Sequence, residues 1–399
     1  MSRNQTSRIP HQIISYALIA FVLFISSGAS NLANDKNVLI GGWVLFSGVY
    51  FYLENIIKPK FLIAVGIFIC LSAIYFLLNN SYNEVTYFGF FMKLCLAYYC
   101  KDISGEDFSK YFIRTIYVLT CISLVMFLLQ LINFEAVFNQ NKLFVTESNY
   151  LTIKSSSIVF TMVPIHKFRN CGFLWEPGAF ATILLLTFYI NLFNLGEKLW
   201  SKKNIVFLIA ILTTKSTMGI LGLIIPFSLL LKDFINQNRT YQQLSVVIIP
   251  TFLSIATLIF TQVDVLYKKI ATEILEIDDE LTEVEKGIRD DYVVSVTRSV
   301  SVILDWKTIK RYPFFGLGVD MRTTGFKKLG YSEKLETSCG TTILLLRFGF
   351  VGFIIYAFLM YKNAIFDSAI HKIGWVLLIN YTLFSQEISA SPFFHLFVF

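Results

Sequence analysis

EPGAFATILLLTFYINLFNLG, residues 176–196, is a nearly continuous apolar run that opens on Glu-Pro. Apolar and polar residues do not alternate in it, which is typical of a membrane-spanning helix and unlike a barrel strand. Pro177 fits the first turn of such a helix, where a backbone N–H has no partner within the helix. Because backbone groups in hydrocarbon must be satisfied within their own segment, a chain built from such runs is expected to be all-α.

Similar runs recur along the chain, which is 55% hydrophobic and only 15% charged, against roughly 25% charged residues in soluble domains. We therefore expect a polytopic integral membrane protein. The expected spans are residues 12–30, 38–53, 61–78, 85–100, 111–133, 178–196, 204–216, 217–231, 245–263, 339–361 and 373–399. The last range could also form two short spans broken near 385–392, which gives 11 or 12 transmembrane helices in total.

Lysine and arginine sort to one side of these expected spans. The loops on that side hold thirteen of them: Arg3, Arg8, Lys58, Lys60, Lys101, Lys110, Lys198, Lys202, Lys203, Lys232, Arg239, Lys362 and Lys372. The short loops on the other side hold only Lys36 and Lys215. By the positive-inside rule the first side, and with it the N-terminus, is cytoplasmic. This assignment requires two helices within 204–232, turning at 213–217, because a single helix would move every later loop to the opposite side.

Two segments, 134–177 and 264–338, are too polar to cross and fall on the external side as periplasmic loops. Long loops of this kind are often functional. The second is expected to be helical, with an acidic amphipathic stretch over 264–288 and a further helix over 290–311.

Both external loops carry an arginine close to the membrane. Arg169 and Glu176 end the first loop, and Arg298 lies in the second, on one helix face with Asp305 and before the turn PFFGLG at 313–318. The planar guanidinium makes bidentate, charge-assisted bonds to phosphate, so two such loops suit a lipid-linked phosphate. The alternative is that these arginines only reach toward lipid headgroups.

Ionisable residues inside the expected spans are costly and tend to be functional or paired. Arg347, Lys93 and Glu387 meet this description, while Lys215 lies at an external turn. We interpret Lys93 as structural and Arg347 as within reach of an outward-facing cavity. Neither the histidines nor the six cysteines show metal-ligand spacing, so no metal or other cofactor is expected. The net charge of +7 reflects the excess of lysine and arginine in the loops on the cytoplasmic side, so nucleic acid is not an expected partner.

Four motifs together carry a resemblance: RNCGFLWEPGAFA at 169–181, TTKSTMGILGL at 213–223, PFFGLG at 313–318 and TTILLLRFGFVGF at 341–353. In their order and common sidedness they resemble the O-antigen polymerase family, which belongs with the O-antigen ligases and the shape, elongation and division peptidoglycan polymerases. The resemblance implies a GT-C-like membrane fold in the bacterial inner membrane. It also implies an inverting, metal-independent glycosyltransferase of lipopolysaccharide biosynthesis, which polymerises undecaprenyl-diphosphate-linked repeat units at the periplasmic face. A chain-length regulator in the membrane is a possible partner.

The resemblance also implies roles for individual residues. Arg169 with Gly172 matches the arginine motif of the first loop, and Arg298 with Gly318 matches that of the second; both arginines are expected on the diphosphate, whose departure must be stabilised as charge develops. Lys215 and Arg347 are weaker candidates for stabilising the same charge.

Glu176 is expected to accept the proton of the acceptor hydroxyl, beside an aromatic platform at Trp175. Glu336 and Asp320 are alternative bases in the second loop. A structural alternative for Glu176 is that it caps the helix that begins at Pro177, where a carboxylate interacts favourably with the helix dipole.

Two other functions stay open. O-antigen ligases carry a histidine just before the span that follows the second loop, where this chain reads EKLETSCGTT at 333–342 without one, so polymerase is favoured over ligase. A flippase or transporter of the same glycolipid would also need a cationic external cavity. It is expected to show internal repeats and helices broken at the midplane, and the sequence indicates neither.

Overall fold

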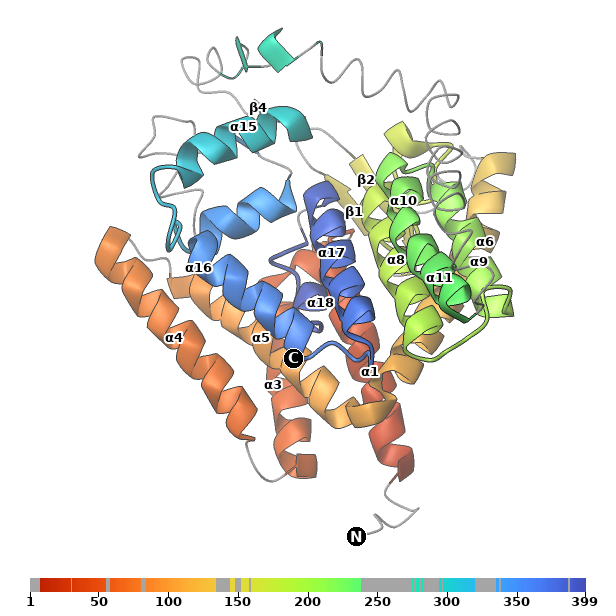
Figure 1. The fold of residues 1–399 in the computed structure, drawn as a ribbon, viewed down its shortest axis with the longest axis horizontal. Helices are drawn as coiled ribbons and strands as arrows, with labels where there is room; N and C mark the ends of the chain where they lie inside the picture. Colours follow the sequence, from red (N-terminus) through yellow and green to blue (C-terminus); the bar gives the residue numbers. More distant parts are fainter. Residues whose placement is uncertain are drawn as a thin grey trace.

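The computed structural model is mostly helical (79%), as the hydropathy pattern predicts (Figure 1). It describes residues 8–29, 31–54, 58–79, 84–133, 144–147, 152–157, 159–237, 275, 277–279, 281–282, 284, 294–295, 297–319, 335–336, 339–386 and 388–399. The described helices of the first half are α1 (Arg8–Ser26), α2 (Asn31–Asn34), α3 (Lys36–Glu54), α4 (Pro59–Asn79), α5 (Glu84–Ser104), η2 (Gly105–Asp107), α6 (Phe108–Ile132), η3 (Pro164–His166) and α8 (Pro177–Phe193). Those of the second half are α9 (Lys202–Thr214), α10 (Thr217–Gly222), α11 (Ile224–Gln237), α15 (Arg298–Ile309), α16 (Gly340–Lys362), α17 (Ala369–Ser385) and α18 (Pro392–His395).

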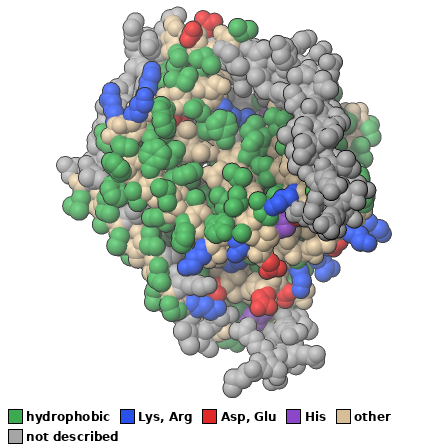
Figure 2. Space-filling model, in the orientation of Figure 1, with side chains coloured by type: hydrophobic (Ala, Val, Ile, Leu, Met, Phe, Trp, Pro, Cys, Tyr) green, Lys and Arg blue, Asp and Glu red, His purple; other side chains and the backbone are tan. Residues whose placement is uncertain are grey.

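Within the described residues, three helical stretches are long and apolar enough to cross a membrane: Glu84–Ile132, Thr217–Ile235 and Gly340–Lys362. Shorter apolar helices cover Pro10–Ser26, Phe61–Leu77, Pro177–Phe193 and Ala369–Phe384. The expected span 245–263 lies outside the described residues. On the face seen in Figure 2, hydrophobic side chains cover the middle of the molecule, and many of the charged ones gather toward its lower end.

The chain turns between two helices within 204–232, which confirms that part of the sequence interpretation. α9 ends at Thr214, and Lys215 adopts the left-handed conformation with φ +47°. Ser216 then caps α10, because its Oγ accepts the N–H of Gly219 at 3.3 Å. The sidedness assigned to this turn stays a prediction.

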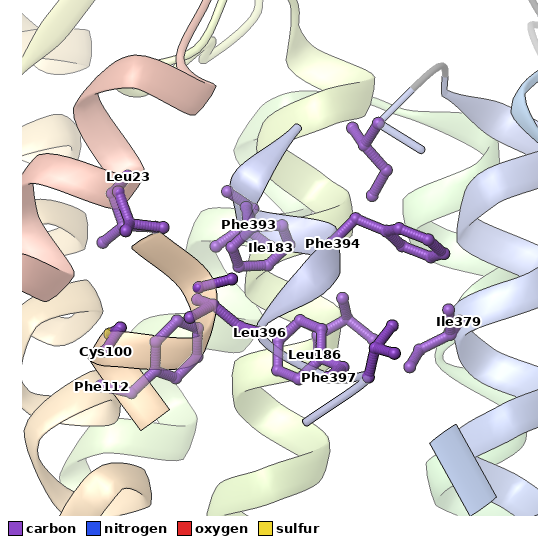
Figure 3. Packing of buried hydrophobic residues seen from close by; sticks show 14 of the residues in the cluster. Leu23, Cys100, Phe112, Ile183, Leu186, Ile379, Phe393, Phe394, Leu396 and Phe397 are labelled. Carbon is purple, nitrogen blue, oxygen red and sulfur yellow. The ribbon is translucent and has the colours of Figure 1, made fainter. Parts of the chain in front are cut away.

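The expected last span, 373–399, ends early. α17 stops at Ser385, and after a polar connection the four-residue α18 lies inside the helix bundle (Figure 1). Figure 3 shows Phe393, Phe394, Leu396 and Phe397 in the middle of the core, surrounded by side chains of α1, α5, α6, α8 and α17. The N–H of Phe393 donates to Ser26 Oγ at 3.1 Å. Residues 392–398 are therefore part of the packed centre, and their apolar character reflects core packing.

The first polar segment, 134–177, contains a small antiparallel sheet that the sequence interpretation did not predict. Its strands are β1 (Phe144–Glu147), β2 (Thr152–Ser157) and β3 (Phe160–Met162), in the order β1-β2-β3. The all-α prediction therefore holds for the helix bundle and is wrong for this segment.

The expected helix over 290–311 begins later than predicted. Residues 294–295 instead form β4 (Val294–Ser295), which pairs in parallel with β5 (Leu335–Glu336). α15 starts at Arg298 because Thr297 has an extended backbone and serves as its N-cap. The acidic stretch 264–288 lies mostly outside the described residues.

α16 is broken in the middle, which corrects the expectation that no helix is interrupted. Gly349 has φ +62° and ψ −171°, a conformation that favours glycine. The turn at 313–318 fills the break: Leu317 and Gly318 donate to the carbonyls of Leu346 and Arg347 at 2.6 and 2.8 Å, and Phe350 and Val351 donate to those of Pro313 and Phe314 at 2.8 and 3.1 Å. Backbone groups released by the break are thus satisfied by the second loop. An added Cβ at Gly316 would lie 2.4 Å from the Leu346 carbonyl, so this close approach requires glycine.

Candidate functional site

The three residues predicted to be catalytic come together from distant parts of the sequence. Nη2 of Arg298, the first residue of α15, lies 3.7 Å from Oε1 of Glu176, just before α8. Both side chains are partly open to solvent, at 29% and 31% exposure. Arg169 is close enough to both for their charges to act on it. Burial lowers the pKa of the Arg169 guanidinium, Arg298 acts in the same direction, and Glu176 opposes them. We call these three residues the Arg–Glu cluster.

Arg169 is held by the turn between α9 and α10. Its Nε donates to the carbonyl of Thr214 at 3.0 Å. The neighbouring Asn170 donates through its backbone to the Thr213 carbonyl at 3.0 Å and through its amide to Thr213 Oγ1 at 3.1 Å. Within the part of the chain that the structure describes, no hydrogen bond engages the two terminal nitrogens of Arg169. The guanidinium is therefore fixed at Nε, and its fork remains available for an anion.

Arg298 is positioned through the rest of α15. Asp305, fully buried, accepts a hydrogen bond from Thr342 Oγ1 at the start of α16. Val300 and Leu304 are also buried, in a small apolar cluster. Asp305 thus anchors α15 to the start of α16, and Arg298, at the N-terminus of the same helix, belongs to the Arg–Glu cluster.

Glu176 occupies the N-cap position of α8, with φ −150° and ψ 159°, but its side chain makes no capping hydrogen bond. Its Oε1 instead accepts a hydrogen bond from Nε2 of Gln386, a buried side chain from the connection between α17 and α18. The predicted capping hydrogen bond is therefore absent, although Glu176 does stand at the N-cap position, where a carboxylate interacts favourably with the helix dipole. Gly178 leaves room for the pair, because an added Cβ there would lie 2.5 Å from Gln386 Nε2 and 3.0 Å from Glu176 Oε1.

Gln386 is a site residue that the sequence interpretation missed. A signal exists, since SQEIS at 385–389 interrupts an apolar run, but from the sequence alone this interruption indicates only a break between spans. Tyr381, five residues earlier on α17, donates its hydroxyl to the Met218 carbonyl of α10 at 2.9 Å.

Gly172 and Trp175 lie in the segment that joins Arg169 to Glu176. Gly172 has φ +56°; its N–H donates to Asn170 Oδ1 at 2.9 Å, and its carbonyl accepts from Thr161 of β3 at 2.6 Å. Trp175 is half-buried, and its ring packs against Gly28, where an added Cβ would lie 3.1 Å away. Much of the Trp175 ring, which the sequence predicts as an aromatic platform, is thus covered by packing.

The remaining predicted residues lie at the turn that holds Arg169, in and beside α16, or where side chains are not described. Lys215 is exposed beside Thr214. Arg347 is buried, at 7% exposure, and its Nη1 donates to Ser389 Oγ at 2.8 Å. The Gly318 N–H donates to the Arg347 carbonyl. The α17–α18 connection therefore contacts Glu176 through one residue and Arg347 through another. Two positions give no side-chain information: Glu336, whose backbone alone is described, and Asp320, which lies outside the described residues.

The chemistry of the cluster follows from its groups. Two guanidinium ions and one carboxylate give an excess of positive charge in a partly buried place, which suits an anion with two phosphate groups. The carboxylate can in addition accept a proton. Among the described residues there is no group of three or more His, Cys, Asp or Glu side chains that could hold a metal ion. Comparisons with known protein families, curated proteins and solved structures give no match for this chain.

Proposed function

We propose that this chain is a bacterial inner-membrane polymerase that joins undecaprenyl-diphosphate-linked oligosaccharide repeat units into O-antigen or a similar surface polysaccharide at the periplasmic face. Its apolar helices are compatible with a membrane protein. The motif resemblance supports the reaction class. The observation that carries the proposal is the convergence of Arg169, Glu176 and Arg298, which come from two separate polar segments.

The two arginines bind the diphosphate of the donor lipid. As the glycosidic bond to the diphosphate breaks, negative charge grows on the leaving oxygen, and fixed guanidinium groups stabilise that charge more than they stabilise the ground state. The free fork of Arg169 and the partly exposed Arg298 provide donors for this purpose.

Glu176 accepts the proton of the acceptor hydroxyl. The hydroxyl oxygen forms the new bond to the anomeric carbon on the face opposite the diphosphate, so the configuration is inverted. Gln386 and Arg298 both contact Oε1 of this carboxylate and so help to fix its orientation. The same carboxylate also forms an ion pair with Arg298, so Glu176 positions that arginine as well.

A flippase of the same lipid is the second candidate, since broken helices are common in transporters. The break in α16, however, is filled by hydrogen bonds from the turn at 313–318, which favours a fixed support over a moving gate. An O-antigen ligase is the alternative within the same enzyme class.

Deleting the gene and examining the lipopolysaccharide ladder tests the proposal. Loss of a polymerase leaves core carrying one repeat unit. Bare core with accumulated lipid-linked polymer would indicate a ligase, and bare core without external polymer would indicate a flippase. Either of these two results would refute the polymerase. Complementation with the wild-type gene should restore the ladder, whereas Arg298→Lys should not.

A further inference from the structure

A cavity lies under the first half of α4, apart from the Arg–Glu cluster. Its volume is about 440 Å³, within the range of about 300 to 1,000 Å³ that small-molecule sites occupy. Its walls come from α4, α5 and α16, together with Val398 and Phe399. None of Arg169, Glu176 and Arg298 lines it.

The cavity exists because α4, at the edge of the bundle in Figure 1, is held to its neighbours by bulky rings. Phe61 stacks on Tyr98 of α5 with ring centroids 4.5 Å apart, and Phe68 stacks on Phe90 at 5.7 Å. The cavity lies between these two contacts, where Val65 of α4 is only half-buried. The rings thus keep the backbone of α4 away from α5 and leave space between them.

Most of the cavity wall is apolar and accessible. Leu94 of α5 and Ile355 of α16 face each other across it and are half-buried, while Ile63 at its edge is 62% exposed. Such a wall offers water few hydrogen-bond partners. The neighbouring surface of α4 is apolar as well, since Leu62 is 56% exposed. In a bundle that spans a membrane, the hydrocarbon chains of lipids reach an opening of this kind and gain by burial in it.

The charged side chains of the lining stand together at one end of the cavity. Lys58 precedes α4, Lys101 and Asp102 lie near the end of α5, and Lys362 ends α16. Nζ of Lys58 is 2.6 Å from Oδ1 of Asp102, and this ion pair joins two of the walls. Lys362 is exposed, with its ammonium 6.0 Å from the centre of the Phe358 ring. A lysine placed in this way can bind a lipid phosphate from the solvent side while its stem stays on apolar surface.

The position of this charged end indicates which lipid fits. Thr342, at the start of α16, contacts α15, whose first residue is Arg298. Lys362 is at the other end of α16, and roughly 20 Å of helix separate it from the break at Gly349. A lipid phosphate at Lys362 therefore lies on the side opposite to the Arg–Glu cluster, which the sequence predicts to be cytoplasmic. The donor lipid proposed for the cluster has its diphosphate on the other side.

We propose that this cavity binds an acyl chain of a phospholipid from the leaflet next to Lys362, with the lipid phosphate at Lys362. This goes beyond the proposed function and does not depend on it. The bound chain fills the space that the side chains leave under α4, and it adds contacts between α4, α5 and α16.

Native mass spectrometry of the purified full chain tests the proposal, with phosphatidylglycerol titrated into the neutral detergent. Wild type should retain one tightly bound phospholipid. Leu94→Trp fills the cavity with an indole ring and should weaken binding about tenfold or more, because methylene groups kept out of the cavity lose their burial. Lys362→Met should weaken it about fivefold, whereas Lys362→Arg, which keeps the charge, should bind as wild type does. Val118→Trp is the matched control, since Val118 is 50% exposed on α6 and does not line the cavity.

Thermal unfolding shows which variants are folded, and Ile355→Trp fills the cavity from the opposite wall should Leu94→Trp fail to fold. Unchanged binding in a folded cavity-filling variant would overturn the proposal, as would equal loss in Val118→Trp. Unchanged binding in Lys362→Met would remove the phosphate contact.

Two competitors identify the ligand. Glycerol 3-phosphate should not displace the phospholipid, and displacement by it would show that the site holds a free phosphate without an acyl chain. Undecaprenyl phosphate should compete only weakly. If it binds more tightly than phosphatidylglycerol, the cavity belongs to the polyprenyl chain and the proposal is refuted.

Discussion

Replacing Gly178 by alanine should lower the activity while leaving the fold nearly unchanged. The added Cβ would lie 2.5 Å from Nε2 of Gln386 and 3.0 Å from Oε1 of Glu176, both distances too short to persist. The atom in the way is the far end of a flexible side chain, so Gln386 can rotate its amide aside. It then loses its hydrogen bond to the Glu176 carboxylate.

The magnitude follows from that single bond. A hydrogen bond to a charged group contributes about 1.5 to 3 kcal/mol, while alanine in a helix gains up to about 1 kcal/mol over glycine. We therefore expect only a small fall in thermal stability. If Gln386 orients Glu176 for proton transfer, the same energy lost from the transition state lowers the rate by about ten- to 150-fold.

The assay is the polysaccharide ladder of a deletion strain that carries the variant, together with protein level and thermal unfolding of the purified protein. Gly48→Ala on α3 is the control, because an added Cβ there meets no atom within 4 Å. It should leave both polymer and stability close to wild type. Polymer of normal length and amount from Gly178→Ala at normal protein level would refute the reasoning.

Three further predictions follow from the site and the topology. Arg169→Lys and Arg298→Lys keep the charge but lose the fork, so polymer synthesis should fall by about two to four orders of magnitude at unchanged membrane levels; full activity in both would show that the arginines only reach toward lipid headgroups. Glu176→Asn and Glu176→Gln should both abolish polymer, and normal polymer from either would remove the base assignment. In a background without the native cysteines, a cysteine replacing Ser157 should react with a membrane-impermeant maleimide in intact spheroplasts, and one replacing Lys202 should not; the reverse pattern would overturn the sidedness.

Most helices could be predicted because their signal is local. The apolar run after Glu176 and the Pro177 start both correspond to α8, and the polar residues at 213–217 correspond to the turn at Lys215. The break in α16 could not be predicted in this way. Gly349 stands within a continuous apolar run, and the hydrogen bonds that satisfy the break come from the turn at 313–318. Hydropathy carries no information about such distant partners.

The same difference between local signals and distant contacts decides which residues of the candidate site could be predicted. Arg169 and Glu176 are close in sequence, and their placement before an apolar run was enough to make them candidates. Arg298 became a candidate through its loop and the motif resemblance, but its 3.7 Å approach to Glu176 depends on how α15 packs on α16. Gln386 has a side chain that is polar yet uncharged, so only the folded chain distinguishes it from an ordinary residue of a helix break.

The buried segment 392–398 has a consequence for how the protein is made. It fills the centre between α1 and α5, and Ser26 of α1 bonds to Phe393. The ribosome synthesises this segment after every helix that it contacts. Protein interiors are close-packed, so the helices made earlier cannot reach their final packing around a centre that does not yet exist. We expect the nascent bundle to remain loosely packed until residues 392–398 enter it. Until then it should be cleaved by proteases and bound by chaperones more readily than the finished protein.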